Sequence, residues 1–506
     1  MTVTCRLLRS RNKVLPPTEY LAVALTVLGL LVPVGESDVL GDFRKTFRAT
    51  RNPEQKHEQR LAALNSVKDF DDPKLGMALV AAYSQVNKEL AKREDEHREY
   101  VLRLARNVAL EMREGINDPR LLLEVAMERI MALRSPASIC PIVEDALSNR
   151  TLPLTLRLEC ARLARFLADE VPGPILKLLS KRPRSPEDTL TLLTCAGALG
   201  PGGRPALKTA LGTLSHQDAA LREAAFAALS TIGSGEGIAP MVERLGVERG
   251  HTLKRLTAAL QVLTGQKISS SLSAWSSWLN ENGQAHIQGQ VPLGQGAAVV
   301  QTLAQGGTSY HGLPIEGQSV LFVVDVSQSM HVMMARKDEA EEAAPESRLE
   351  RALTELVRTL QILPPDTRFN IVAFAGRLEL YAEESVLASP ERVQEAITWL
   401  NARKMNLGTR IHDALEIAFH LAGRGIEDAY FNSSVDTIFL LTDGQPIAGG
   451  KKDPPVGILR AAKRWNLGAR VIIHTVGLGD GVPVQFLKKL AKAHGGQFAH
   501  EKSKPK

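Results

Sequence analysis

The fold is decided by the stretch from Val320 to Met330, which reads VLFVVDVSQSM. Residues Val320 to Val326, which are apolar except for Asp325, are predicted to form a strand. A strand that is apolar at almost every position is typical of a parallel sheet whose two faces are both covered by helices. The part from Asp325 to Ser329 carries an oxygen-bearing side chain at every second position. The stretch therefore predicts a buried strand that ends in a polar loop.

Further strands and helices alternate after this first strand. Apolar runs predict more strands, at residues 369–374, 437–441 and 471–476. Apolar residues at helical spacing predict helices between them, at residues 349–360, 393–400, 411–421, 456–465 and 484–493. This alternation predicts a doubly wound α/β domain over residues 317–500, with a mostly parallel sheet. Ligands of such sheets bind at the carboxyl ends of the strands.

Three polar motifs fall at that edge of the predicted sheet. They are Asp325-Val326-Ser327-Gln328-Ser329 after the first strand, Leu407-Gly408-Thr409 before a helix, and Thr442-Asp443-Gly444 after a later strand. Carboxylates and hydroxyls are ligands for hard cations such as magnesium or manganese. The motifs therefore predict a divalent-cation site. The alternative is that Asp325 and the serines only satisfy turns and backbone groups.

The three motifs, in this chain order, resemble the metal-ion-dependent adhesion site (MIDAS) of the von Willebrand factor A (VWA) family. The resemblance covers about 180 residues, and it implies five metal ligands: Asp325, Ser327, Ser329, Thr409 and Asp443. The implied ion is Mg²⁺, with Mn²⁺ or Ca²⁺ as alternatives. Two positions depart from the family pattern, because Gln328 and Leu407 each replace a glycine. Neither change removes a ligand.

The family resemblance also implies a function in adhesion rather than catalysis. The cation keeps one coordination position open, and an Asp or Glu of a protein partner fills it. Gln328 and Gly408 are the residues expected to contact that partner. Two alternatives stay open, a hydrolase that uses the metal and a cytoplasmic accessory factor of an ATPase. The sequence contains no phosphate-binding P-loop, zinc-protease helix or nucleophile-elbow motif.

Residues 53–282 have a different pattern, which is helical and weakly repetitive. Helices are predicted to end near Leu133, Leu167, Leu199 and Ile232, at intervals of 34, 32 and 33 residues. A proline follows each of these positions near the predicted start of the next helix, at Pro141, Pro174, Pro205 and Pro240. This period resembles HEAT-type repeats, which stack helix pairs into an α-solenoid. An irregular helical bundle is the alternative.

The predicted repeats end in a segment that contains Trp275 and Trp278, which we expect to cover the open end of the stack. Residues 283–316 are rich in Gly and Gln up to Gly307, and they are predicted to form a linker. Beyond the α/β domain, residues 501–506 form a short basic tail.

Charge and cysteine content exclude several classes of protein. The net charge of +6 is small for 506 residues, and no basic block of the nucleic-acid-binding type occurs. The four cysteines lack the C-x-x-C spacing of a zinc site. The simplest interpretation is that Cys140, Cys160 and Cys195 are core residues, with a single disulfide as the alternative.

Residues 1–40 have the pattern of a targeting segment. Four basic residues, Arg6, Arg9, Arg11 and Lys13, precede an almost uninterrupted apolar run from Tyr20 to Gly35. This order predicts either a cleaved signal peptide or an uncleaved membrane anchor. Both place the rest of the chain outside the cytoplasm, with this segment as the only contact with a membrane. A buried globular helix is the third interpretation.

Overall fold

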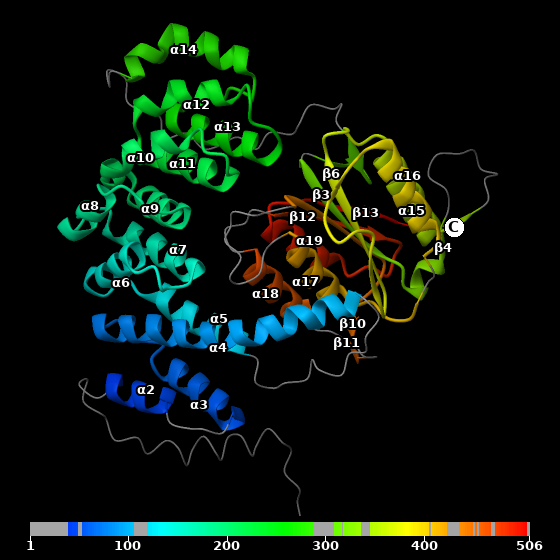
Figure 1. Cartoon of the computed structure of the whole chain (residues 1–506), viewed down its shortest axis with the longest axis horizontal. Coiled ribbons are helices and arrows are strands. Elements are labelled where there is room, and N and C mark those ends of the chain that lie inside the picture. Colours follow the sequence, from blue (N-terminus) through cyan, green and yellow to red (C-terminus); the bar gives the residue numbers. More distant parts are fainter. Residues whose placement is uncertain are drawn as a thin grey trace, which may run out of the picture. The chain divides into compact units, whose positions relative to one another are not determined.

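A computed structural model describes residues 39–48, 53–105, 119–287, 308–315, 317–334, 345–403, 406–422, 435–448, 451–452, 455–466 and 471–502 (Figure 1). The chain divides into two compact units, Met1–Phe70 and Asp71–Lys506. The predicted targeting segment lies outside the described residues, except that helix α2 (Val39–Arg48) already begins at Val39. Every helix within the described ranges is too short or too polar to span a bilayer.

The carboxyl-terminal part of the chain contains a seven-stranded sheet. Its strands are β3 (Ser319–Asp325), β6 (Arg368–Phe374), β7 (Leu378–Leu380), β8 (Val386–Leu387), β9 (Thr437–Thr442), β12 (Ile472–Leu478) and β13 (Phe498–Glu501). The order is β13-β12-β9-β3-β6-β7, and β8 also pairs with β6. The five strands from β13 to β6 are parallel, whereas β7 and β8 are antiparallel to β6. The predicted mostly parallel sheet is confirmed.

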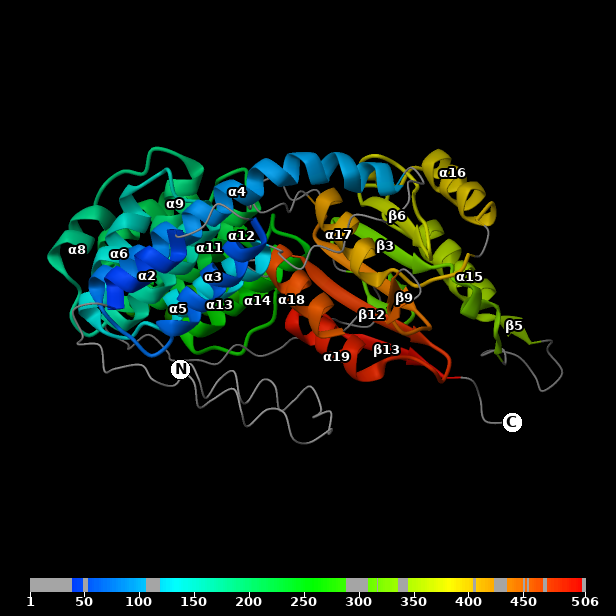
Figure 2. The ribbon, with the colours of Figure 1, turned by 90° about the horizontal axis from the view of Figure 1, so that it is seen from below.

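Helices cover both faces of this sheet, as Figure 2 shows. One face packs against α15 (Arg348–Gln361) and α16 (Pro390–Asn401). The other packs against α17 (Ile411–Leu421), α18 (Pro455–Trp465) and α19 (Val484–Ala493). The side chains of β3 alternate between the two cores, with Phe322 in the first and Leu321 in the second. This double burial explains why residues 320–324 of the strand are all apolar.

Capping residues fix where α15 and α16, the first two helices of the α/β domain, begin. Ser347 and Glu350 form a reciprocal capping box at the start of α15, in which each side chain accepts a hydrogen bond from the other's backbone N–H. The Ser389 hydroxyl accepts a hydrogen bond from the backbone N–H of Arg392, and Pro390 takes the first position of α16.

Short strands that the sequence did not predict surround the sheet. They form three antiparallel pairs: β1 (Ser309–Tyr310) with β2 (Leu313–Pro314), β4 (Met333–Met334) with β5 (Glu346–Ser347), and β10 (Ile447–Ala448) with β11 (Lys451–Lys452). Tyr310 is fully buried in the core beside Phe322 and Phe439. The α/β domain therefore begins before the predicted boundary at residue 317.

Two other predicted boundaries need correction. The predicted linker 283–316 starts too early, since helix α14 (Leu272–Ile287) continues into it. The predicted basic tail 501–506 starts too early as well, because Glu501 ends β13 and pairs with the ring of His311 at 2.8 Å. The end of β13 is fixed by its pairing with β12, which local composition does not reveal.

The amino-terminal part of the chain is helical throughout its described residues. After α2, the helices are α3 (Pro53–Ser66), α4 (Pro73–Ala105), α5 (Pro119–Ala132), α6 (Pro136–Ser148), α7 (Leu154–Arg162), α8 (Gly173–Leu179), α9 (Pro186–Leu199), α10 (Leu207–Thr213), α11 (Ala219–Ile232), α12 (Ile238–Arg244) and α13 (Gly250–Thr264), followed by α14. Short 3₁₀ segments lie at Leu163–Leu167, Gly200–Ala206 and Gly235–Gly237. Neighbouring helices α7, α9, α11 and α13 pack against one another in chain order.

The predicted ends of the repeating helices agree with the structure. Helices α9 and α11 end at Leu199 and Ile232, and the 3₁₀ turn after α7 ends at Leu167. One predicted start is wrong, because α6 begins at Pro136 and Pro141 lies inside it. Pro136 occupies the first turn, where a missing N–H costs nothing, so it is the proline that marks the helix start.

The remaining sequence predictions for this half concern buried side chains. Cys160 and Cys195 are buried, Cys140 is partly buried, and all three are free thiols. Trp275 is fully buried, donates a hydrogen bond to the Ser269 carbonyl at 2.8 Å, and meets Trp278 edge-on. These residues act as core side chains.

Two buried histidines of the α/β domain predict how its stability depends on pH. Burial lowers the pKa of both His474 and His494 to about 4. Each ring accepts a hydrogen bond at Nδ1, from the Gln497 N–H at 3.1 Å and from the Asn466 side-chain amide at 2.8 Å respectively. The folded state therefore binds fewer protons than the unfolded state between pH 6.5 and 4, and stability falls as the pH falls through this window.

We expect the change His494→Gln to remove part of this acid sensitivity. The loss for one such histidine is on the order of 3 kcal/mol across the window. Denaturant unfolding at several pH values should show that the free energy of unfolding depends less steeply on pH in the variant than in the wild type. If the free energy of unfolding depends on pH equally in both proteins, His494 does not stay neutral in the folded protein.

Candidate metal centre

Asp325 ends β3 at the centre of the sheet, and its carboxylate is fully buried. One oxygen accepts a hydrogen bond from the Ser327 N–H at 2.8 Å, and the other accepts one from the Thr442 hydroxyl at 2.6 Å. Burial raises the pKa of this carboxyl to about 7, and the neighbouring charge of Asp443 adds to the shift, against the lowering by those hydrogen bonds. Neither of these two donors carries a charge, so a cation bound here would stabilise the ionised form of Asp325.

The serines of the loop connect the ends of β3 and β9. The hydroxyls of Ser327 and Ser329 lie 3.0 Å apart, and Ser329 donates to a carboxylate oxygen of Asp443 at 2.6 Å. Asp443 directly follows β9, which pairs with β3 in parallel, so both carboxylates stand at the same edge of the sheet. Ser327 is buried, whereas Ser329 is exposed to solvent.

The third motif reaches the same point through a loop beside the first. Asn406 lies in a bridge with Ser327, and the Gln328 N–H donates to the Asn406 carbonyl at 2.9 Å. The hydroxyls of Thr409 and Ser329 both lie close to Gly444, 3.6 and 3.7 Å from the position that a Cβ atom would take there. Gly408 has a φ of +99°, a conformation that favours glycine. Its predicted role as a partner contact is untested, and its backbone requirement alone explains a glycine there.

Arg348 is a charged residue of the site that the sequence did not predict. Its guanidinium donates from Nη1 to the second oxygen of Asp443 at 2.7 Å, and both side chains are largely buried. Gly479 packs against the guanidinium, where any side chain would overlap it. A cation in the first turn of a helix opposes the helix dipole. That mismatch was the only sequence signal for a specific anionic partner.

The residues present fit a hard divalent cation. The donors that converge are all oxygens, two carboxylates and three hydroxyls, and they come from three separate segments of the chain. This chemistry suits Mg²⁺ or Mn²⁺ better than softer metals. The five predicted residues are therefore brought together, as the sequence required, while metal binding itself stays a prediction.

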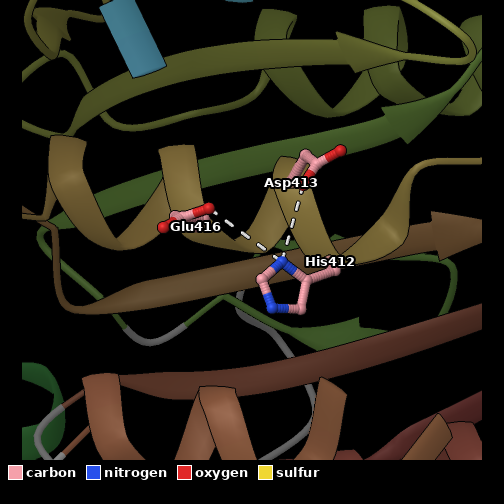
Figure 3. Close-up of side chains that lie close together, drawn as sticks. All are labelled: His412, Asp413 and Glu416. Carbon is pink, nitrogen blue, oxygen red and sulfur yellow. Dashed lines mark ion pairs between the residues drawn. The ribbon is translucent and has the colours of Figure 1, made fainter. Parts of the chain in front are cut away.

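A second group of ligand-type side chains lies on α17, just after Thr409 (Figure 3). His412 Nδ1 lies 3.5 Å from an oxygen of Asp413 and 4.0 Å from one of Glu416. Asp413 already forms a buried ion pair with Arg410 at 2.6 Å, and the His412 ring meets Trp465 edge-on. These contacts anchor the start of α17, and so they position Thr409 for the first site.

Comparison with known proteins identifies the domain that carries the first site. The family model for the von Willebrand factor type A domain matches residues 319–506. Residues 319–506 form a VWA domain. Domains of this family commonly serve protein–protein interaction and adhesion, and the fold predicted from the sequence is confirmed for this part of the chain.

The relatives that match the VWA domain are much longer proteins, and the chain spans about a fifth of their length. The chain is 28% identical over 185 residues to inter-alpha-trypsin inhibitor heavy chain 4 of Mus musculus. It is 30% identical over 186 residues to inter-alpha-trypsin inhibitor heavy chain H4 of Homo sapiens. The matched segments cover 36% and 37% of this chain but only 18% of each relative.

Solved structures with a similar domain include a von Willebrand factor type A protein from Catenulispora acidiphila. It has 18% identity, a TM-score of 0.28, and coverage of 36% of this chain and 38% of its own. Another is proximal thread matrix protein 1 from the mussel byssus with a zinc-occupied MIDAS motif. It has 21% identity, a TM-score of 0.25, and coverage of 36% and 41%.

Proposed function

We propose that the VWA domain binds one divalent cation and uses it to hold an acidic residue of a protein partner. The observation that carries this proposal is the convergence of five oxygen-bearing side chains from three motifs at one edge of the sheet. Mg²⁺ is the proposed ion, with Mn²⁺ or Ca²⁺ as alternatives. Metal-bridged adhesion, rather than catalysis, is the proposed use of the site.

The distribution of exposure across the site supports this proposal. Asp325 and Asp443 are almost completely buried, whereas Gln328 and Ser329 face solvent. An ion held among these residues would be open to a partner from the side of the loop that carries Gln328 and Ser329. One of the two acids already shares its charge with Arg348, so the protein supplies less than the two negative charges of a dication. A bound ion would therefore attract a further carboxylate from outside.

The rest of the chain enters the proposal as a scaffold. We propose that the helices from α5 to α14 stack as HEAT-like repeats and present the VWA domain to its partner. We also propose an extracytoplasmic location, secreted or anchored through the amino-terminal segment. Accessibility of a carboxyl-terminal tag to protease in intact cells tests this location. Complete protection of the tag would favour the cytoplasmic accessory role instead.

The change Thr409→Val tests the proposed metal centre with little change in side-chain shape. Loss of one hydroxyl ligand should weaken Mg²⁺ or Mn²⁺ binding about tenfold, a difference of about 1.4 kcal/mol. Titration calorimetry on the full chain measures this affinity. Thr398→Val on α16 is the matched control and should bind the ion as the wild type does. Equal affinities for both variants would exclude Thr409 as a ligand.

A further inference from the structure

An open hollow lies directly beside the proposed metal centre. Its volume is about 610 Å³, and its lining residues are Gln328, His331, Gly376, Arg377, Asn406 and Leu407. Three segments form it, namely the metal loop, the turn after β6 and the loop that leads to Thr409. Hydrogen bonds tie these segments together, including one from the Asn406 N–H to the Val326 carbonyl at 3.2 Å and one from the Arg410 N–H to the Ala375 carbonyl at 3.2 Å. The hollow is therefore a fixed part of the same rim.

Leu407 gives this rim an apolar contact point. The residue is 77% exposed, which is the largest value among the exposed large apolar residues of the described chain. Val332 and Met333 follow the metal loop and are also exposed, at 48% and 51%. Their neighbours Met330 and Met334 are instead buried in the core. Among the described residues that line the hollow, Leu407 is the one large apolar residue, so it is the point at which an apolar side chain of a partner can pack.

The charge of the lining is one-sided. It contains one cation, Arg377, together with His331, and no carboxylate. Arg377 is exposed, and within the described part of the chain its backbone carbonyl accepts a hydrogen bond while its guanidinium contacts no carboxylate. Other exposed arginines of the domain, such as Arg392, pair with a glutamate. The guanidinium is thus placed to bind an anionic group of a partner.

We propose that the hollow binds a protein segment in which an apolar residue is flanked by two acidic residues. This proposal rests on the proposed function, since the first acidic residue reaches the cation. The apolar side chain packs on Leu407, and the second acidic side chain pairs with Arg377. Gln328 and His331 border the segment between the cation and Leu407. The surface thus selects the sequence around the acidic residue, which the cation alone does not.

Two synthetic peptides test this proposal on the full chain. One contains Asp-Gly-Leu-Gly-Glu flanked by glycine and serine, and the other carries Gly in place of Leu. Binding is measured by fluorescence anisotropy in Mg²⁺ and in chelator. We expect the Leu407→Ser change to weaken binding of the leucine peptide about tenfold, to the affinity of the glycine peptide. The same change should leave the affinity of the glycine peptide as it is. Arg377→Gln should weaken both peptides and reduce the salt dependence of binding.

Matched controls separate this surface from the rest of the domain. Leu387→Ser changes another exposed leucine, which pairs with Arg368 at the opposite end of β6. Arg358→Gln changes an exposed arginine on α15. Neither control should alter peptide binding. Equal effects of Leu407→Ser and Leu387→Ser, or no binding of either peptide to the wild type at about 1 mM, would overturn the proposal.

The chelator arm distinguishes this proposal from the metal-bridged function. Peptide binding that depends on Leu407 but persists in chelator would support the hollow and contradict the cation bridge. Binding that needs Mg²⁺ but does not depend on Leu407 would support the cation bridge and contradict the hollow.

Discussion

Replacing Arg348 with methionine is expected to destabilise the VWA domain by about 3–5 kcal/mol in the absence of metal. The Arg348 guanidinium lies 2.7 Å from an oxygen of Asp443, whose side chain is fully buried. Methionine fills similar space but leaves the carboxylate without its positive partner. The cost of a buried, uncompensated charge is far larger than the net value of the ion pair itself.

Divalent metal should reverse part of this loss. A cation bound between Asp325 and Asp443 supplies the missing positive charge, so Mg²⁺ should raise the melting temperature of the variant more than that of the wild type. Thermal unfolding in chelator and in Mg²⁺ measures both effects. The double change Arg348→Met with Asp443→Asn should recover most of the stability in chelator, because no charge is left buried.

A second arginine of the same helix is the matched control. Arg351 pairs with Glu346 at 2.5 Å, and its side chain has a similar exposed fraction, 13% against 11% for Arg348. Its partner Glu346 is 12% exposed, whereas Asp443 is not exposed at all. Arg351→Met should therefore lower the free energy of unfolding less than Arg348→Met does. If the two variants lose the same stability, Arg348 has no special role at the site.

Asp325→Ala is expected to abolish metal binding while the sheet stays folded. This residue is the central carboxylate of the proposed site, and its loss removes both a ligand and a negative charge. Two hydrogen bonds, from Ser327 and Thr442, are lost with it, at a cost of about 1–3 kcal/mol. Removing a carboxylate that is buried and has a raised pKa offsets part of that cost.

Titration calorimetry with Mg²⁺ and Mn²⁺ measures this loss, and circular dichroism checks the fold. Asp436→Asn is the control, since Asp436 is a partly buried acid that precedes β9, at the end of the strand opposite to Asp443. Its carboxylate accepts hydrogen bonds from the backbone of Gln318 and Ser319. Unchanged metal affinity in Asp325→Ala would refute the proposed site, and loss of affinity in Asp436→Asn would show that the effect is not local.

The order of helices and strands in the VWA domain was accessible from the sequence. Helix α17 was predicted at its observed bounds, and β3, β6, β9 and β12 within two residues. These elements are apolar over one or both faces because the sheet is covered on both sides, and that burial leaves a clear pattern. Strand β13 was missed, since it lies at the edge of the sheet and its residues are only partly buried.

The five oxygen-bearing residues of the candidate site were also accessible. Each stands next to the end of a predicted strand or the start of a predicted helix. A parallel sheet brings the carboxyl ends of its strands to one edge, so local position was enough to place Asp325 beside Asp443. Chain order and residue type were sufficient for this part.

The sequence by itself determined that oxygen ligands gather at one edge of a parallel sheet. Only the tertiary structure decided which charge balances Asp443 and which surface borders the site. Arg348 and Asp443 are 95 positions apart in the sequence. Leu407 lines the hollow because its neighbour Asn406 pairs with Ser327 of the metal loop. The physical reason is that periodicity records burial within one element. Contacts between side chains of different elements depend instead on strand order and loop path, which no local pattern encodes.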